Sequence, residues 1–254
     1  MGDFVRAISA YNTSLQLAGR HGWWSFVWIP IAVSILVGVG LAMLIIYAAP
    51  PISQTIEGWY PWDTAKSLIS VTVAVLTALI ILSLGVLLFK YLVLIIAFPF
   101  MSFLSQRVEK SLYGSIEGYE GGQAVSQFFK EIIRGVGIST RLIFWEILWV
   151  VLLLLLSLIP GMAIITGPAI FLVHSYFAGC VNMDYTLERY YGIPASIRFM
   201  RHHFWMTLGN GFVFMLIFSI PVLGIFLSPV WGTMAASIST LDLIRGAPQT
   251  DHKR

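Results

Sequence analysis

The stretch that decides the fold is residues 142–183, LIFWEILWVVLLLLLSLIPGMAIITGPAIFLVHSYFAGCVNM, an apolar run interrupted near its middle by Pro160. Pro168 follows eight residues later. Residues 204–241 form a second apolar run whose two prolines have the same spacing. A shared spacing with few identities indicates an internal structural repeat, which we interpret as two helical hairpins.

The prolines also predict where the helices of each hairpin begin. Proline is poorly tolerated inside a helix but favoured at its first position, so we predict new helices that start at Pro168 and Pro229. The preceding crossings, residues 160–167 and 221–228, contain no charged residue. Two arrangements fit: re-entrant hairpins whose tips stop inside the bilayer, or four spanning helices joined by tight turns. The lack of polar anchors favours the re-entrant hairpins.

Composition places the chain in a membrane. The 254 residues are 58% hydrophobic and 11% charged, and the mean hydropathy is +0.85. We therefore expect one all-α membrane domain over residues 1–254. Cys180 is the single cysteine, which excludes a disulfide within the chain. The sequence has no nucleotide-binding loop, catalytic triad or zinc motif that we can defend. We therefore expect no cofactor, no bound metal and no enzymatic activity.

The remaining elements follow from apolar runs and amphipathic patterns. We predict an amphipathic helix, a first transmembrane helix, a long second helix, another amphipathic helix and a polar tail, at residues 3–20, 23–50, 67–113, 123–138 and 245–254. A loop over 51–66 joins the first two spans. Apart from Lys66, the basic residues outside the second span can all lie on one side. By the positive-inside rule that side is the cytoplasm, with both termini.

Motifs spread along the chain resemble those of a known family, the CysZ sulfate permeases and proteins that share their membrane domain. The matching positions are Gly22-x-x-x-Phe26-Val27-x-x-Pro30, Ile96-Ala97-Phe98-Pro99-Phe100 with Leu104 and Glu109, Ile159-Pro160-Gly161, Asp184-Tyr185, and Ile220-Pro221 with Pro229. The resemblance implies two transmembrane helices and two partly inserted hairpins. It also implies an oligomer in the bacterial inner membrane that takes up sulfate for cysteine synthesis.

The sequence departs from the family pattern at two positions. The arginine that the family uses to hold sulfate is replaced by Trp24, and the asparagine after the Pro-Phe pair is replaced by Met101. Arg20 and His21 adjoin Gly22, so we take these three residues as the candidate anion-binding group.

Helix ends provide a second candidate for anion binding. A helix N-terminus presents unpaired N–H groups and a partial positive charge. If helices begin at the prolines, Thr166, Gly167 and Ser228 flank two such ends within the membrane and line an anion path, to which we add Glu109 from the family motif. The alternative is that proline and glycine there only permit tight hairpin tips.

Ionisable residues in the apolar runs have a structural and a functional interpretation. Glu146 lies near Arg141 in sequence, and an ion pair at the membrane interface is favoured over a proton relay. His174 is expected to be a buried, hydrogen-bonded histidine, the alternative being a gate or proton site.

The connector between the hairpins carries the remaining charges of interest. Asp184 is expected to pair with Arg189 or Arg198. The basic cluster at 198–203 either anchors lipid headgroups or attracts anions to a pathway.

These observations lead to one functional hypothesis and one rival. The leading hypothesis is a channel or permease for a small inorganic anion, sulfate or sulfite. Two spans and two half-hairpins cannot enclose a pore, so this requires a homo-oligomer. The rival is a membrane scaffold, or a protein that interacts with lipids, without transport. Membrane lipids are partners in both cases, and nucleic acid in neither.

Overall fold

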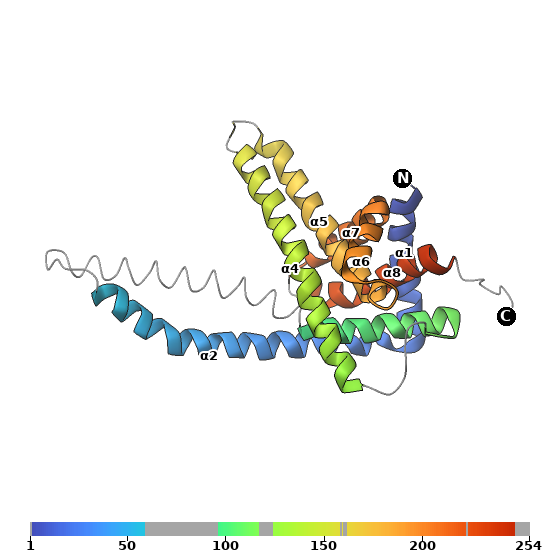
Figure 1. The fold of residues 1–254 in the computed structure, drawn as a ribbon, viewed down its shortest axis with the longest axis horizontal. Helices are drawn as coiled ribbons and strands as arrows, with labels where there is room; N and C mark the ends of the chain where they lie inside the picture. Colours follow the sequence, from blue (N-terminus) through green and yellow to red (C-terminus); the bar gives the residue numbers. More distant parts are fainter. Residues whose placement is uncertain are drawn as a thin grey trace. The chain divides into compact units, whose positions relative to one another are not determined.

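The computed structural model describes residues 2–58, 96–116, 124–157, 159, 162–221 and 223–246. Within these residues all regular structure is helical, which confirms the all-α prediction (Figure 1). The chain divides into two compact units, residues 1–29 with 98–254 and residues 30–97. Both hairpins belong to the larger unit.

Helix α1, Gly2–His21, presents a stripe of small side chains and one tyrosine to the rest of its unit. Its buried residues include Ala7, Ala10, Tyr11 and Ala18, a spacing that places them on one helical face. This face packs against α7, Phe204–Phe218, and α8, Leu223–Arg245. The Tyr11 hydroxyl donates to the Asn210 carbonyl at 2.6 Å, and burial raises the pKa of that hydroxyl well above its usual value. The amphipathic helix predicted over 3–20 therefore covers protein with its buried face.

The first predicted span begins and ends differently from the prediction. Gly22, with φ of 67°, separates α1 from a short 3-10 helix, η1, Trp23–Val27. Helix α2 then runs from Trp28 to Gly58, so residues 51–58 are helical and the predicted loop over 51–66 is wrong there. Proline is tolerated within membrane helices because neighbouring helices, Ser and Thr side chains or local helix adjustments satisfy the backbone groups that it leaves unbonded.

The long second helix is described only at its end. Residues 96–113 are helical, and the rest of the predicted helix over 67–113 lies outside the described residues. The same holds for residues 247–254 of the predicted tail.

The first hairpin consists of α4, Ala124–Ser157, and α5, Ala163–Leu187. The amphipathic helix predicted over 123–138 is the beginning of α4 and not a separate element. Helix α6, Ile193–His202, then leads into the α7–α8 hairpin. The prolines were expected to begin helices, but Pro168 lies inside α5 and Pro229 inside α8, so that prediction is wrong.

Hydrogen bonds at the first tip explain why α5 begins early. The Met162 carbonyl accepts the N–H of Thr166 at 2.9 Å, which closes a helical turn before the proline is reached. Pro168 in the second turn then removes a single i to i−4 hydrogen bond from a helix that already exists. The crossing between the helices is correspondingly shorter than predicted.

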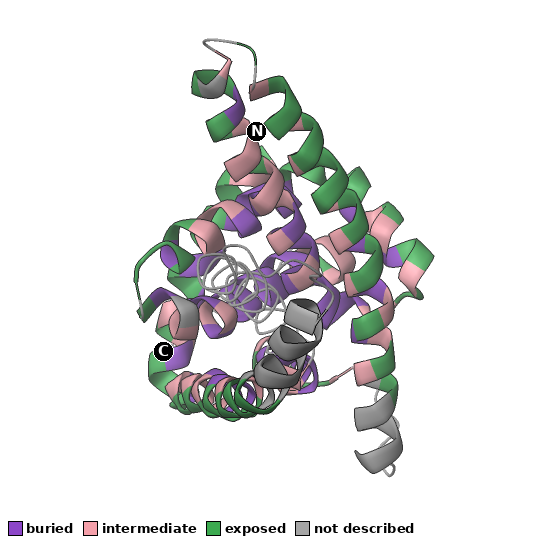
Figure 2. Cartoon of the chain, turned by 90° about the vertical axis from the view of Figure 1, so that its left-hand side faces the viewer, coloured by how far each residue is buried: buried purple, intermediate pink, exposed green. Residues whose placement is uncertain are grey.

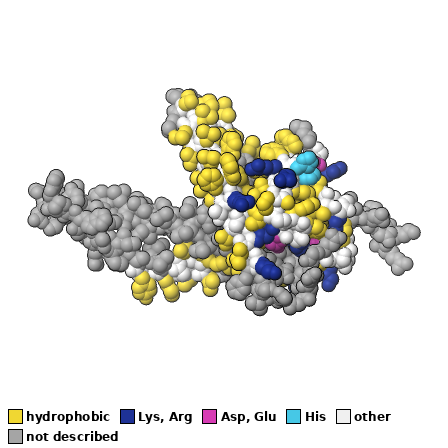
Figure 3. All heavy atoms as spheres, viewed as in Figure 1, with side chains coloured by type: hydrophobic (Ala, Val, Ile, Leu, Met, Phe, Trp, Pro, Cys, Tyr) yellow, Lys and Arg dark blue, Asp and Glu magenta, His cyan; other side chains and the backbone are white. Residues whose placement is uncertain are grey.

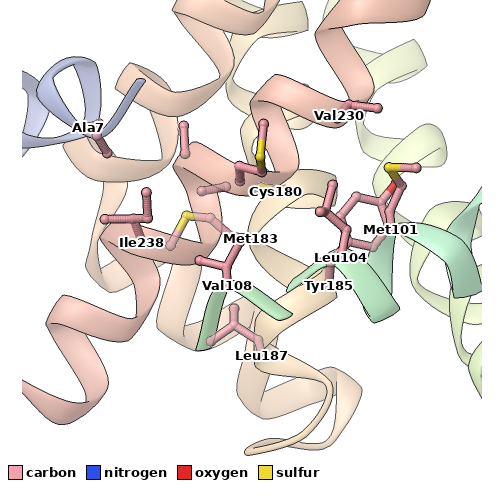
Figure 4. Packing of buried hydrophobic residues seen from close by; sticks show 14 of the residues in the cluster. Ala7, Met101, Leu104, Val108, Cys180, Met183, Tyr185, Leu187, Val230 and Ile238 are labelled. Carbon is pink, nitrogen blue, oxygen red and sulfur yellow. The ribbon is translucent and has the colours of Figure 1, made fainter. Parts of the chain in front are cut away.

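Glycines allow a close backbone contact in the larger unit, where α5 crosses α7. A Cβ added to Gly211 would lie 1.6 Å from the Ser175 carbonyl oxygen, and one added to Gly179 would lie 1.9 Å from that of Thr207. The two backbones therefore touch where neither helix can carry a side chain. Figure 4 shows the core beside this crossing, with Met183 of α5 near Ile238 of α8.

The free end of the α4–α5 hairpin carries apolar side chains on its outside. Phe144, Leu148, Leu152 and Leu155 are 62%, 48%, 55% and 59% exposed, and Figures 2 and 3 show this exposed, hydrophobic surface along the projecting hairpin. A helix that is apolar on its outside fits lipid rather than water. Among the described residues, three stretches are long and apolar enough to cross a membrane, Trp23–Met43, Ile132–Ser157 and Ile164–Leu187.

Candidate functional site

Buried polar side chains lie along α5 and the turn after it, α8 and the helix at 96–113, and several of them join these elements through hydrogen bonds. We call this group the polar seam, and its members are Ser105, Glu109, Asn182, Asp184, Thr186, Arg189, Ser228, Thr233 and Ser237. Polar groups inside a membrane protein are costly unless they are paired or hydrated, so each member has to be explained by its partners.

One end of the polar seam is a closed charge network around Glu109. Its carboxylate lies 2.9 Å from the Arg189 guanidinium and 3.5 Å from that of Arg245, and it accepts a hydrogen bond from the Tyr190 hydroxyl. Arg189 also donates to the Ser105 hydroxyl at 3.0 Å. The predicted pair between Asp184 and Arg189 is therefore wrong, because Arg189 serves Glu109.

Asp184 pairs instead with Arg134, which the sequence reasoning missed. The guanidinium contacts both carboxylate oxygens, at 2.8 Å through Nη2 and 3.3 Å through Nε. Arg134 also donates to the Ser196 hydroxyl and the Tyr191 carbonyl, both at 2.8 Å. This two-pronged contact ties α4 to α5 and to the start of α6.

Hydroxyl groups continue the polar seam between the three elements. Ser105 and Thr186 hydroxyls lie 2.8 Å apart, and Thr186 donates to the Ser237 hydroxyl at 3.1 Å. Ser237 in turn donates to the Thr233 carbonyl at 2.7 Å. These neutral groups join the helix at 96–113, α5 and α8 through side-chain hydrogen bonds.

Three members of the polar seam have buried atoms that lack a hydrogen-bond partner in the described part of the chain. They are the amide nitrogen of Asn182 and the hydroxyls of Ser228 and Thr233. Asn182 is 3% exposed and the other two are fully buried. Leaving such a group unpaired costs about 1–3 kcal/mol. All three can donate a hydrogen bond, so water or the oxygen of an anion can complete them.

The predicted pathway residues are distributed over separate places. Ser228 belongs to the polar seam, and Thr166 is 2% exposed near the first tip. Gly167 is helical, with open space where a Cβ would lie. Because α5 and α8 begin at Ala163 and Leu223, the helix N-termini lie nearer the tips than predicted. The carboxylate of Glu109, also a predicted pathway residue, is engaged by arginines, as described above.

The candidate anion-binding group lies at the end of α1. Arg20 and His21 are both exposed. The His21 ring stacks on Trp23 with centroids 4.8 Å apart, and its Nδ1 lies 3.1 Å from the Leu17 carbonyl. Gly22 takes the left-handed conformation that turns the chain into η1. The role of these residues in binding an anion remains a prediction.

A further ion pair within the first hairpin corrects the sequence prediction. Glu146 of α4 lies 2.6 Å from the His174 ring of α5, so its partner is His174 and not Arg141. The hydrogen bond expected of His174 is confirmed, but its side chain is 34% exposed, so the expected burial is wrong. Thr233, by contrast, was not recognised at all, because a threonine in an apolar helix has no distinguishing sequence signal.

Comparisons with known proteins agree with the fold and the motifs. A family model described as Sulfate transporter CysZ/Etoposide-induced protein 2.4 matches residues 10–229. Two curated proteins from Pseudomonas aeruginosa, strains LESB58 and PAO1, each named Sulfate transporter CysZ, are 27% identical to the chain over 220 residues. The match covers 85% of this chain and 86% of each relative.

Proposed function

Because the chain belongs to the Sulfate transporter CysZ/Etoposide-induced protein 2.4 family, we propose that this membrane protein carries sulfate, or a similar anion such as sulfite, across the bacterial inner membrane. The matched relatives bear the name of sulfate transporters. Three described helices are long and apolar enough to cross a bilayer. The proposal includes uptake that supplies cysteine synthesis, and it involves no enzymatic step.

The observation that carries the proposal is the set of buried donors on Asn182, Ser228 and Thr233 that have no hydrogen-bond partner among the described residues. Sulfate offers only acceptor oxygens, and neutral N–H and O–H donors can replace part of its hydration shell. The charged members of the polar seam are already matched, Glu109 with Arg189 and Asp184 with Arg134. An anion in the seam would therefore meet neutral donors, because the described arginines Arg134 and Arg189 are already paired with carboxylates. Such moderate binding suits passage.

Helix lengths support partial insertion of the second hairpin. Helix α7 has 15 residues, about 22 Å of helix, which is less than the roughly 30 Å hydrocarbon core. Helices α4 and α5 are each long enough to cross, so the first hairpin either tilts within the membrane or spans it. We propose a homo-oligomer with cytoplasmic termini, in which neighbouring subunits complete the walls of the passage.

Uptake of radiolabelled sulfate into proteoliposomes that contain the purified protein tests the function. We expect saturable uptake that excess sulfite reduces and excess chloride leaves nearly unchanged. Protein-free liposomes are the control for leakage. Uptake equal to that control for both sulfate and sulfite would reject the proposal and favour a scaffold.

Thiol labelling tests the hairpins. Ile159→Cys and Ile220→Cys, at exposed positions of the two tips, are made in a Cys180→Ala background. Partial insertion predicts that a membrane-impermeant reagent added from the periplasm leaves both unlabelled. Rapid labelling of Ile220→Cys from that side would mean that α7 and α8 cross completely.

A further inference from the structure

A groove of about 330 Å³ lies among α4, α5 and α6, apart from the polar seam. Arg141 of α4 and Arg201 of α6 line it together with Trp145, Trp149 and Tyr176. None of these residues belongs to the polar seam. The groove therefore combines two cations and an aromatic wall in one open depression.

Neither arginine has a carboxylate partner among the residues that the structure describes. Arg134 and Arg189, by contrast, each hold a buried aspartate or glutamate. Arg141 and Arg201 are both exposed, so their guanidinium groups can reach a ligand in the groove. Two guanidinium groups that face one depression present the planar donors that recognise phosphate oxygens.

The aromatic wall extends away from the charges along one face of α4. Arg141, Trp145 and Trp149 are four residues apart, so they lie above one another on the helix. From Arg141 to Trp149 is about 12 Å at 1.5 Å per residue. Beyond Trp149 the face continues into the exposed apolar surface of the hairpin. Across the groove Tyr176 is held by stacking on Phe204, with centroids 5.1 Å apart.

We propose that this groove binds one anionic phospholipid, with the headgroup phosphate between Arg141 and Arg201 and an acyl chain along Trp145 and Trp149. Charge complementarity selects the phosphate, and the continuity of the aromatic wall with the lipid-facing surface selects a molecule with a tail. A free sulfate or phosphate would use the arginines but leave the wall unused. Basic pockets beside membrane helices bind acidic headgroups for the same reason.

Only part of the basic cluster at 198–203 takes part in this site. Arg201 lines the groove, whereas Arg198 does not. The second cation, Arg141, comes from a different helix. Arg198 is exposed on the same helix as Arg201, so it provides a matched control for nonspecific attraction to acidic lipids.

Native mass spectrometry of the purified full-length protein in detergent, titrated with phosphatidylglycerol and with phosphatidylcholine, tests the site. We expect one phosphatidylglycerol to bind in preference to phosphatidylcholine. Arg141→Gln and Arg201→Gln should each weaken its binding about fivefold, and Arg198→Gln should not. Arg141→Lys, which keeps the charge but not the planar guanidinium, should bind with an affinity between those of the wild type and Arg141→Gln. If Arg141→Gln folds poorly, the comparison of Arg201→Gln with Arg198→Gln decides the test.

Two further arms separate a lipid from a free anion. Trp149→Ala should weaken phosphatidylglycerol binding, and neither millimolar sulfate nor glycerophosphoglycerol, which lacks acyl chains, should displace the lipid. Displacement by sulfate would overturn the proposal and make the groove a free-anion site. Equal losses in Arg198→Gln and Arg201→Gln would also overturn it, because the attraction would then be nonspecific.

Discussion

Substitution of Gly211 by alanine should separate α5 from α7 and destabilise the fold. The added Cβ would lie 1.6 Å from the Ser175 carbonyl oxygen and 2.5 Å from the Gly179 nitrogen, whereas ordinary contacts begin at 3.4 Å. The helices would have to move apart by about 2 Å, and both obstacles are backbone atoms that cannot rotate away. Overpacking of this kind costs about 1–3 kcal/mol. We expect about 3 kcal/mol for Gly211→Ala because two well-packed helices must shift as bodies.

Thermal unfolding of the purified protein in detergent, followed by circular dichroism, measures the effect. Gly167→Ala in α5 is the matched control, because nothing lies within 4 Å of the position that its Cβ would take. Alanine is the better helix former, so this variant should be as stable as the wild type or up to about 1 kcal/mol more stable.

An unfolding midpoint for Gly211→Ala equal to that of the wild type would refute the reasoning. It would mean that α5 and α7 do not cross in backbone contact. A loss of stability in Gly167→Ala as large as in Gly211→Ala would be equally contrary, because the cost would then not arise from the crossing.

Two other predictions concern charge. Arg134→Leu leaves the buried Asp184 carboxylate without its cation and should lower the free energy of unfolding by about 3–5 kcal/mol. Adding Asp184→Leu should restore much of this stability. A double variant as unstable as Arg134→Leu would contradict the pairing. Burial, followed by repulsion from His202, lowers the pKa of His203 below 6.5. The neutral ring therefore stabilises the fold fully above pH 6.5, and this contribution is lost as the pH falls through the lowered pKa. The unfolding midpoint of His203→Gln should fall less than that of the wild type between pH 6.5 and about pH 5, and parallel curves would contradict the prediction.

Apolar runs and their proline interruptions predicted the hairpins but not their boundaries. The runs were visible because a membrane helix needs about 20 apolar residues. The start of α5 at Ala163 was not visible, because a helix already closed by the Met162 carbonyl tolerates Pro168 in its second turn. A proline within a membrane hairpin therefore indicates where a helix starts only to within a few residues.

The candidate site shows where sequence reasoning ends. Ser228 was singled out from its place before a proline, and the structure buries its hydroxyl without a described partner. The partner of Asp184 was sought nearby in sequence, yet Arg134 is 50 residues away and arrives through the packing of α4 on α5. Thr233 could be recognised only once the neighbours of its hydroxyl were known. Contacts between distant segments, which no local pattern encodes, decide all of these roles.

The most direct measurement of the central claim is the initial rate of radiolabelled sulfate uptake by Thr233→Val in proteoliposomes. Valine has the shape of threonine and removes only a hydroxyl that has no partner in the described structure. The free energy of unfolding should therefore change by no more than about 1 kcal/mol. Loss of a hydrogen bond to a charged anion should slow uptake about tenfold. The control is Thr140→Val, which removes an exposed hydroxyl that donates to the Val136 carbonyl within α4. This variant should transport at the wild-type rate. Uptake by folded Thr233→Val at the wild-type rate would contradict passage through the polar seam.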